Sequence, residues 1–137
     1  MMEFLHPPGW PRPKGYANGV AARGRMIFLS GMVGWDANEK FASDDLTGQV
    51  RQTLENIVAV LEQAGAQPRH IARMVWYVVD KEEYLDAAPR IGEVYREILG
   101  EHYPAMTLVE VAALLEDRAR VEIEVTAVVP EVTAQFG

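Results

Sequence analysis

The clearest periodic pattern in the chain lies between residues 45 and 64. Apolar residues recur there at spacings of three and four, at positions 46, 50, 54, 57, 58, 61 and 64. This spacing places them on one face of a helix. Either Asp44 or Asp45 can cap the start of the helix, and Gly65 stands where a helix C-terminus favours a left-handed residue. We therefore predict an amphipathic helix over residues 45–64.

A second helical pattern follows later in the chain. Apolar residues at positions 84, 88, 91, 95, 98 and 99 return to helical spacing. Pro89 would break this helix in its interior, but a proline is compatible with a first turn. We therefore expect the helix proper to begin at Ala88.

Several segments have the composition or alternation of β-strands. Residues 71–79 are rich in β-branched and aromatic side chains, as in a mostly buried strand. Residues 120–129 alternate between apolar and polar, with Glu122 and Glu124 on the polar side. Further strands are expected at 17–22, 26–33 and 107–113, and the first two could form a hairpin through Arg23-Gly24-Arg25. Residues 1–15, with prolines at 7, 8, 11 and 13, predict an extended arm.

The order β-β-α-β-α-β-β predicts an α+β fold in which two helices cover one face of a mixed sheet. The other face would stay partly uncovered. We expect that face to carry Met106, Leu108 and Glu110 from one strand together with Glu122 and Glu124 from another. A face of mixed apolar and charged groups is more naturally closed by a partner subunit than by water, so we predict a homo-oligomer.

Composition limits the class of protein. A length of 137 residues with 49% hydrophobic residues suits one compact domain, residues 1–137. The chain contains no cysteine, so a disulfide framework and thiolate chemistry are excluded. The start lacks the pattern of a signal peptide, and the apolar runs are too short for a membrane span. We therefore expect a cytoplasmic protein without membrane contact.

Charge and histidine spacing argue against two further classes. A formal charge of −7 opposes nucleic-acid binding, which relies on clustered Lys and Arg. His6, His70 and His102 are isolated in the sequence, whereas a metal site needs converging ligands. We expect surface roles for these histidines and no metal.

Two local features are candidates for chemistry. Ser30-Gly31 ends a predicted strand and could point a backbone N–H into a pocket, or it could simply terminate the strand. Glu122 and Glu124 could act as a paired acid and base, or they could simply lie on the solvent-exposed face of a strand. The residue pattern alone decides neither case. For the two glutamates it favours the solvent-exposed face over a catalytic pair.

Several separated segments together resemble the RidA/YjgF family of reactive-imine deaminases. The matching segments are Pro13 to Val20, Ile27 to Gly31, Gln49 to Gly65, and the run from Tyr103-Pro104-Ala105 through Val109-Glu110-Val111-Ala112 to Val121-Glu122-Ile123-Glu124. In order and spacing they cover nearly the whole chain. The resemblance implies a chorismate-mutase-like fold in a homotrimer with a barrel-like centre and a small-molecule site at each subunit interface. It also implies hydrolysis of enamines and imines to keto acids and ammonia, without a cofactor.

The resemblance also assigns roles to residues. Tyr16 matches a pocket tyrosine, Ser30 and Gly31 match backbone contacts at the strand end, and Glu122 matches the acid that holds the attacking water. The departure is Met106, which stands where deaminases of the family carry a substrate-binding arginine.

Two more positions depart from the family pattern. Leu108 replaces a small residue and Gly92 an asparagine. We therefore expect a more apolar pocket. Arg118 or Arg120 could reach into it and replace the missing arginine.

Three functions follow in order of preference. The first is an imine or enamine deaminase that acts on a more apolar substrate. The second is a non-catalytic trimer that binds a small molecule at the same interfaces. The third is the endoribonuclease or translation-inhibitor activity that has also been attached to the family, which the acidic charge disfavours.

Overall fold

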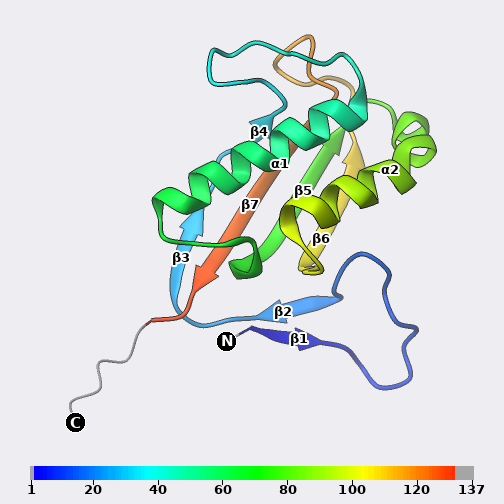
Figure 1. Cartoon of the computed structure of the whole chain (residues 1–137). Helices are drawn as coiled ribbons and strands as arrows, with labels where there is room; N and C mark the ends of the chain where they lie inside the picture. Colours follow the sequence, from blue (N-terminus) through cyan, green and yellow to red (C-terminus); the bar gives the residue numbers. More distant parts are fainter. Residues whose placement is uncertain (1, 132–137) are drawn as a thin grey trace.

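The computed structural model describes residues 2–131, and its centre is a mixed five-stranded sheet (Figure 1). The strand order is β3 (Arg25–Phe28), β7 (Val121–Val129), β5 (Ile71–Val78) and β6 (Ala105–Glu110), and β4 (Met32–Val33) also pairs with β7. The β5 and β6 strands are parallel, whereas β3, β4 and β5 each run antiparallel to β7. The predicted α+β class with a mixed sheet is therefore confirmed.

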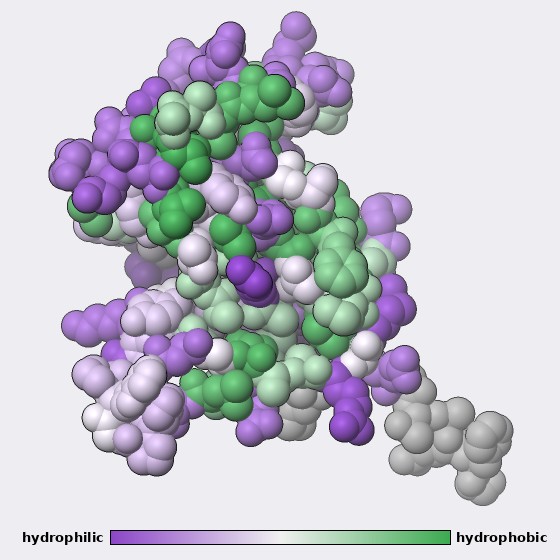
Figure 2. Space-filling model, turned by 180° about the vertical axis from the view of Figure 1, so that it is seen from behind, coloured by the Kyte–Doolittle hydropathy of each residue, from purple (hydrophilic) through white to green (hydrophobic). Residues whose placement is uncertain are grey.

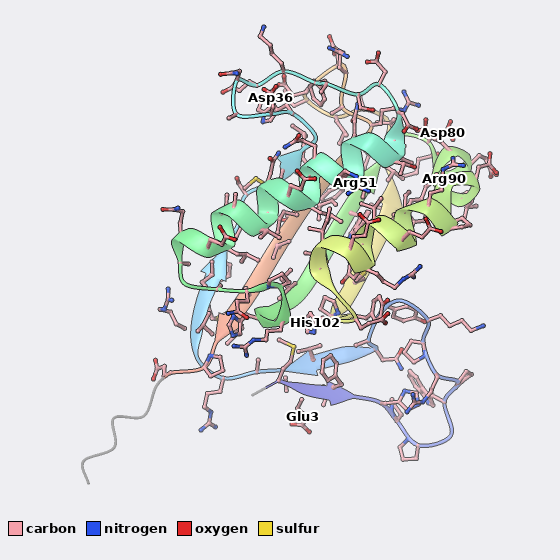
Figure 3. The ribbon with its side chains drawn as sticks, viewed as in Figure 1. Glu3, Asp36, Arg51, Asp80, Arg90 and His102 are labelled. Atoms are coloured by element: carbon pink, nitrogen blue, oxygen red, sulfur yellow. The ribbon has the colours of Figure 1, made fainter. Side chains whose placement is uncertain are left out.

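Two helices, α1 (Leu46–Gln63) and α2 (Lys81–Leu99), pack side by side on the same face of the sheet (Figure 1). Arg51 of α1 pairs with Glu97 of α2 at 2.9 Å (Figure 3). A short 3-10 helix, η1 (Pro68–His70), leads into β5. Within the described part of the chain, neither helix is long and apolar enough to cross a bilayer.

The first helix forms as its pattern predicts. Asp45 caps α1, and its side chain accepts a hydrogen bond from the Gly48 N–H at 3.2 Å. Gly65 follows the helix with a φ of 70°, a conformation that glycine adopts without a steric penalty. The apolar stripe is buried against the sheet at Leu46, Val50, Leu54, Ile57 and Leu61.

The second helix begins earlier than predicted, at Lys81 rather than at Ala88. Asp80 caps it by accepting a hydrogen bond from the Glu83 N–H at 3.2 Å (Figure 3). Pro89 lies inside the helix on an exposed position, and Leu85, whose carbonyl loses its partner, is exposed as well. Water can hydrate that carbonyl, so the proline does not end the helix.

The predicted N-terminal hairpin is wrong. The β2 strand (Gly19–Ala21) pairs with β1 (Glu3–Leu5), a strand within the predicted arm, and β3 pairs with β7 instead. Gly24 lies against the end of β7, where a Cβ atom would be 2.1 Å from the carbonyl oxygen of Val129. The glycine thus permits a close approach between the start of β3 and the end of β7, and it does not form a hairpin tip. The predicted strand 26–33 is also divided, into β3 and β4.

The two faces of the sheet differ from the predicted distribution of side chains. Glu122 and Glu124 alternate with Val121 and Ile123, which are buried under the helices. Trp76 pairs with both Ile123 and Leu108, so Leu108 lies on the helix side of the sheet. The same register places Met106 and Glu110 on the helix side. The expected grouping of these residues with Glu122 and Glu124 is therefore wrong.

The face without helices stays open to solvent. We call it the open sheet face and define it by the residues Met26, Phe28, Arg73, Val75, Tyr77, Thr107, Val109, Glu122, Glu124 and Thr126. Phe28 is 71% exposed and Met26 is 55% exposed. Figure 2 shows the molecule from this side, with hydrophobic and hydrophilic residues intermixed.

Candidate functional site

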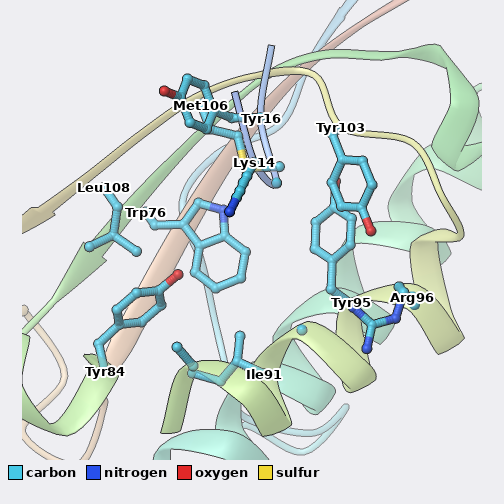
Figure 4. Close-up of a pocket in the computed structure, with 13 residues that line it drawn as sticks. Lys14, Tyr16, Trp76, Tyr84, Ile91, Tyr95, Arg96, Tyr103, Met106 and Leu108 are labelled. Carbon is cyan, nitrogen blue, oxygen red and sulfur yellow. The ribbon is translucent and has the colours of Figure 1, made fainter. Parts of the chain in front are cut away.

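A pocket of about 480 Å³ lies between α2, the β5–β6 side of the sheet and the loop before β2 (Figure 4). Its lining combines aromatic, apolar and cationic side chains: Lys14, Gly15, Tyr16, Trp76, Tyr84, Ala88, Ile91, Gly92, Tyr95, Arg96, Tyr103, Met106 and Leu108. The volume falls within the usual range for small-molecule sites.

The backbone explains why these residues converge. The α2 residues that line the pocket recur at spacings of three and four from Tyr84 to Arg96, so they share one helix face. Met106 and Leu108 alternate along β6 and point to the same side. The Ala17 N–H donates to the Pro104 carbonyl at 2.9 Å, which holds Tyr16 beside the start of β6.

Two aromatic pairs form opposing walls of the pocket (Figure 4). The Trp76 and Tyr84 rings meet edge to face, with centroids 6.4 Å apart. Tyr95 and Tyr103 stack with centroids 5.4 Å apart and an interplanar angle of 10°. The Tyr95 hydroxyl donates to the His102 carbonyl at 2.6 Å, which fixes this ring.

Two tyrosines of the walls, Tyr84 and Tyr95, stay protonated. Burial raises the pKa of Tyr84 above its usual value. Burial, with a smaller contribution from Tyr103, also raises the pKa of Tyr95. Both hydroxyls are therefore neutral donors at neutral pH.

Four of the residues that the sequence singled out meet in this pocket: Tyr16, Gly92, Met106 and Leu108. They come from a loop, a helix and a strand that are far apart in sequence. Met106 and Leu108 are half-buried and pack against the core. Both side chains contribute apolar surface to the pocket.

Ser30, Gly31 and Glu122 lie elsewhere in the chain. Glu122 belongs to the open sheet face, on the opposite side of the sheet from Met106. A Cβ atom at Gly31 would be 2.2 Å from Glu122 Oε2, so the glycine backbone lies directly against the carboxylate. We call Ser30, Gly31 and Glu122 the Glu122 cluster. Within one chain this cluster and the pocket are separate.

Glu124 has its own partner on the open sheet face. The Tyr77 hydroxyl donates to Glu124 Oε1 at 2.5 Å. This hydrogen bond to the carboxylate is the main reason that the pKa of Tyr77 is raised. Glu124 is thus engaged, whereas no side-chain hydrogen bond of this kind occupies Glu122 among residues 2–131.

Arg118 and Arg120 do not line the pocket. Arg118 forms an ion pair with Asp44 and lies over the Phe41 ring, 5.6 Å from its centroid. Arg120 Nε lies 2.8 Å from a Glu83 carboxylate oxygen, and this hydrogen bond raises the pKa of Arg120. Both guanidinium groups are bound within their own chain, and neither lines this pocket.

The cations that do line the pocket are Lys14 and Arg96, which the sequence reasoning missed. Arg96 lies four residues after Gly92, which places both on one helical face. That spacing was the available signal.

The histidines differ in their surroundings. His6 is exposed, as predicted, and its ring contacts the Trp10 carbonyl at 3.0 Å. His70 is buried, and His102 is half-buried with Nε2 2.7 Å from the Ile71 carbonyl, so the surface prediction is wrong for these two. His70 closes the turn before β5, and His102 contacts the first residue of that strand. No cluster of three metal-ligating side chains occurs among the described residues.

Comparison with known proteins gives a consistent family. Residues 11–129 match the family described as Endoribonuclease L-PSP. A RutC family protein of Pyrococcus horikoshii is 32% identical over 93% of this chain and 98% of its own. A 2-iminobutanoate/2-iminopropanoate deaminase of Salmonella typhimurium is 33% identical over 82% of this chain and 86% of its own.

Solved structures agree with the sequence matches. A Rid family protein of unknown function from Yersinia pestis superposes with a TM-score of 0.83 at 28% identity, covering 93% of this chain and 98% of its own. A member of the YjgF/YER057c/UK114 family from Mycobacterium tuberculosis has a TM-score of 0.63 at 32% identity, covering 84% of this chain and 87% of its own. The chain belongs to the RidA/YjgF family, whose members also carry the names L-PSP and RutC.

Proposed function

We propose that this protein is an imine or enamine deaminase whose site is assembled between copies of the chain. The observation that carries the proposal is the division of the predicted site residues over two faces of one sheet. Tyr16, Met106 and Leu108 line the pocket, whereas Glu122 lies on the open sheet face. A second copy that packs its open sheet face beside the pocket would bring the two groups together, and a homotrimer does this three times.

The chemistry requires one water molecule and no cofactor. Water adds to the imine carbon, and Glu122 takes a proton from that water as general base. This proton passes to the nitrogen and gives a carbinolamine. A second proton then moves from its hydroxyl to the nitrogen, the C–N bond breaks, and ammonia and a carbonyl compound leave. One imine and one water thus become one carbonyl compound and one ammonia, so an enamine substrate must first tautomerise to the imine.

The pocket favours a substrate with a large apolar group. Its walls are the aromatic pairs and the half-buried Met106 and Leu108. The Salmonella relative is named for the small imino acids 2-iminobutanoate and 2-iminopropanoate. The wide aromatic pocket supports a bulkier imine as the preferred substrate here.

The first prediction tests turnover. Amino-acid oxidase generates imines in situ from phenylalanine, leucine and alanine, and ammonia release is measured with and without this protein. We expect acceleration that is larger for phenylalanine and leucine than for alanine. Glu122→Gln should lower kcat about 10²–10⁴-fold, the usual contribution of a general base.

A matched control separates catalysis from folding. Glu97→Gln removes an exposed carboxylate on α2 that is remote from the proposed water site, and it should leave turnover unchanged. No acceleration with any of the three imines would overturn the proposal, as would equal rates for the wild-type and Glu122→Gln proteins.

One observation favours a non-catalytic binding protein as the second candidate. The pocket lining contains no Asp or Glu, so one copy on its own offers binding groups but no general base. Such a protein would show ligand-dependent thermal stabilisation without product formation. The same panel of imines and keto acids distinguishes the two candidates.

A further inference from the structure

The lining of the pocket is cationic in a chain that is acidic overall. Lys14 and Arg96 contribute to it and no Asp or Glu does, although the chain has a formal charge of −7. The ion pairs among residues 2–131 are Arg51–Glu97, Arg118–Asp44 and Arg120–Glu83, so Lys14 and Arg96 belong to none of them. The Glu101 carboxylate accepts from the Tyr103 hydroxyl at 3.3 Å but is not itself part of the lining. Within one chain, an anion therefore meets attraction without a competing carboxylate in the lining.

Arg96 is aimed along the pocket by the helix itself. Side chains in a helix point back toward its N-terminus, which directs Arg96 over the preceding turn. A Cβ atom at Gly92 would lie 3.4 Å from Arg96 Nη1. The Arg96 guanidinium therefore lies beside the Gly92 backbone, within contact distance of it, and its five N–H donors suit a carboxylate.

Trp76 supplies an independent sign of an absent acceptor. Its side chain is only 4% exposed, and its indole Nε1 has no hydrogen-bond partner among the described residues. A buried donor without a partner is rare, because it forfeits its hydrogen bond to water. Trp76 forms one wall of the pocket (Figure 4), so an oxygen of a bound ligand could satisfy it.

The aromatic and aliphatic walls of the pocket indicate which group the anionic ligand carries besides its charge. Trp76 and Tyr84 face the stacked Tyr95 and Tyr103 across the pocket (Figure 4), and flat aromatic groups bind well between such rings. Ile91 and Leu108 add aliphatic surface. The space thus combines a cationic and donor-rich part with an aromatic part.

We propose that this pocket binds the carboxylate of an aromatic organic acid, with the Arg96 guanidinium and the Trp76 indole N–H as donors and the aromatic walls around the ring. The identity of the acid rests on the proposed function: a deaminase would bind it as the 2-oxo product or as the 2-imino precursor. Arg96 is then the residue that determines specificity for acids. The binding claim itself is measured without turnover.

The second prediction uses calorimetric titration of the whole protein with three probes. Phenylpyruvate has both the ring and the carboxylate, phenylacetone lacks the carboxylate, and pyruvate lacks the ring. We expect phenylpyruvate to bind at least about tenfold more tightly than either of the others. Arg96→Gln should lower the ratio of the two affinities by about threefold or more, and the Trp76 N–H accounts for the preference that remains.

Two further variants sharpen the test. Arg90→Gln is the matched control, because Arg90 is an exposed arginine of the same helix that does not line the pocket. It should leave all three affinities unchanged. Trp76→Phe keeps an aromatic wall but removes the N–H, and it should weaken phenylpyruvate several-fold more than phenylacetone.

The outcomes separate this inference from the proposed function. Equal affinities for phenylpyruvate and phenylacetone, or an unchanged ratio in Arg96→Gln, would overturn the inference even if imines are hydrolysed. Binding of phenylpyruvate that depends on Arg96 without hydrolysis of any imine would uphold the inference and remove the deaminase proposal.

Discussion

His70 is held in its neutral form by the turn that precedes β5. Its Nδ1 accepts a hydrogen bond from the Gln67 N–H at 2.9 Å, which a protonated nitrogen could not do. Burial is the main cause that lowers the pKa of His70, and the nearby Arg69 and His102 lower it further. The folded chain therefore resists protonation of a group that the unfolded chain protonates readily.

The third prediction follows from this difference. Because the pKa of His70 is lower in the folded than in the unfolded state, its contribution to stability is present above pH 6.5 and is lost as the pH falls through the lowered pKa. Urea unfolding at pH 7.5 and pH 5.5 measures the loss. His70→Gln should lose less stability over this interval than the wild type, whereas the exposed His6→Gln should behave as the wild type does. An identical loss in His70→Gln would contradict the argument.

At the scale of single residues, the sequence indicated several residues of the pocket but not those whose role depends on their neighbours in space. Tyr16, Gly92, Met106 and Leu108 were selected and meet in one pocket. Arg96 and Trp76 were missed. Their importance comes from their surroundings, the Gly92 backbone beside the Arg96 guanidinium and an indole N–H without an acceptor, and neither is visible in a linear sequence.

The start of α2 positions the cationic part of the pocket. Asp80 caps the helix through the Glu83 N–H, and the helix face from Tyr84 to Arg96 lines the pocket. The α2 pattern was recognised from its spacing, but its start was predicted seven residues too late, because Pro89 was interpreted as a first-turn residue. The cap outweighs the proline here, since the proline lies on an exposed position.

The fourth prediction concerns this cap. Asp80→Ala removes the acceptor for the Glu83 N–H and should lower the free energy of unfolding by about 1 kcal/mol. Thermal and urea unfolding measure the change. Asp86→Ala serves as the control, because Asp86 is exposed within the same helix and caps nothing, and its effect should stay within about 0.5 kcal/mol. Equal effects of the two variants would show that the cap contributes nothing.

At the scale of the whole molecule, the order of the helices and strands after residue 45 could be predicted from hydrophobic periodicity. Which side chains of the edge strand β6 face the helices could not. In β7 the polar and apolar residues alternate, so its orientation was predictable. In β6 apolar residues occupy both parities, Met106 and Leu108 on one side and Val109 on the other. Only the pairing with β5 decides which side faces the helices, and that pairing is a long-range contact.

The open sheet face and the outer edge of β6 are both suited to contact with another copy. Phe28 and Met26 are largely exposed, and among residues 2–131 β6 ends the sheet with only the Ala17 bridge beyond it. Exposed apolar groups and an unpaired strand edge are features that proteins usually cover. Such contact is also what the division between the pocket and the Glu122 cluster requires.

The fifth prediction tests whether two copies share one site. Glu122→Gln disables the Glu122 cluster, and Ala88→Trp fills the pocket, so each variant alone should be inactive. If a site combines the pocket of one copy with the Glu122 of its neighbour, a mixed assembly restores some sites. Random mixing at equal amounts gives both intact halves in about one site of four, and a trimer that contains both variants has one such site in about three. About a third of the wild-type activity should therefore return in the purified mixed trimer.

The mixing experiment has its own controls. The two proteins are unfolded and refolded together, or co-expressed with different tags, and the mixed assembly is purified through both tags before imine hydrolysis is measured. A double variant with both substitutions, mixed with itself, should stay inactive. Recovery shows that the halves come from different chains. No recovery in an assembly that native mass spectrometry proves to be mixed would place the whole site within one chain, and the pocket and Glu122 would then need another connection.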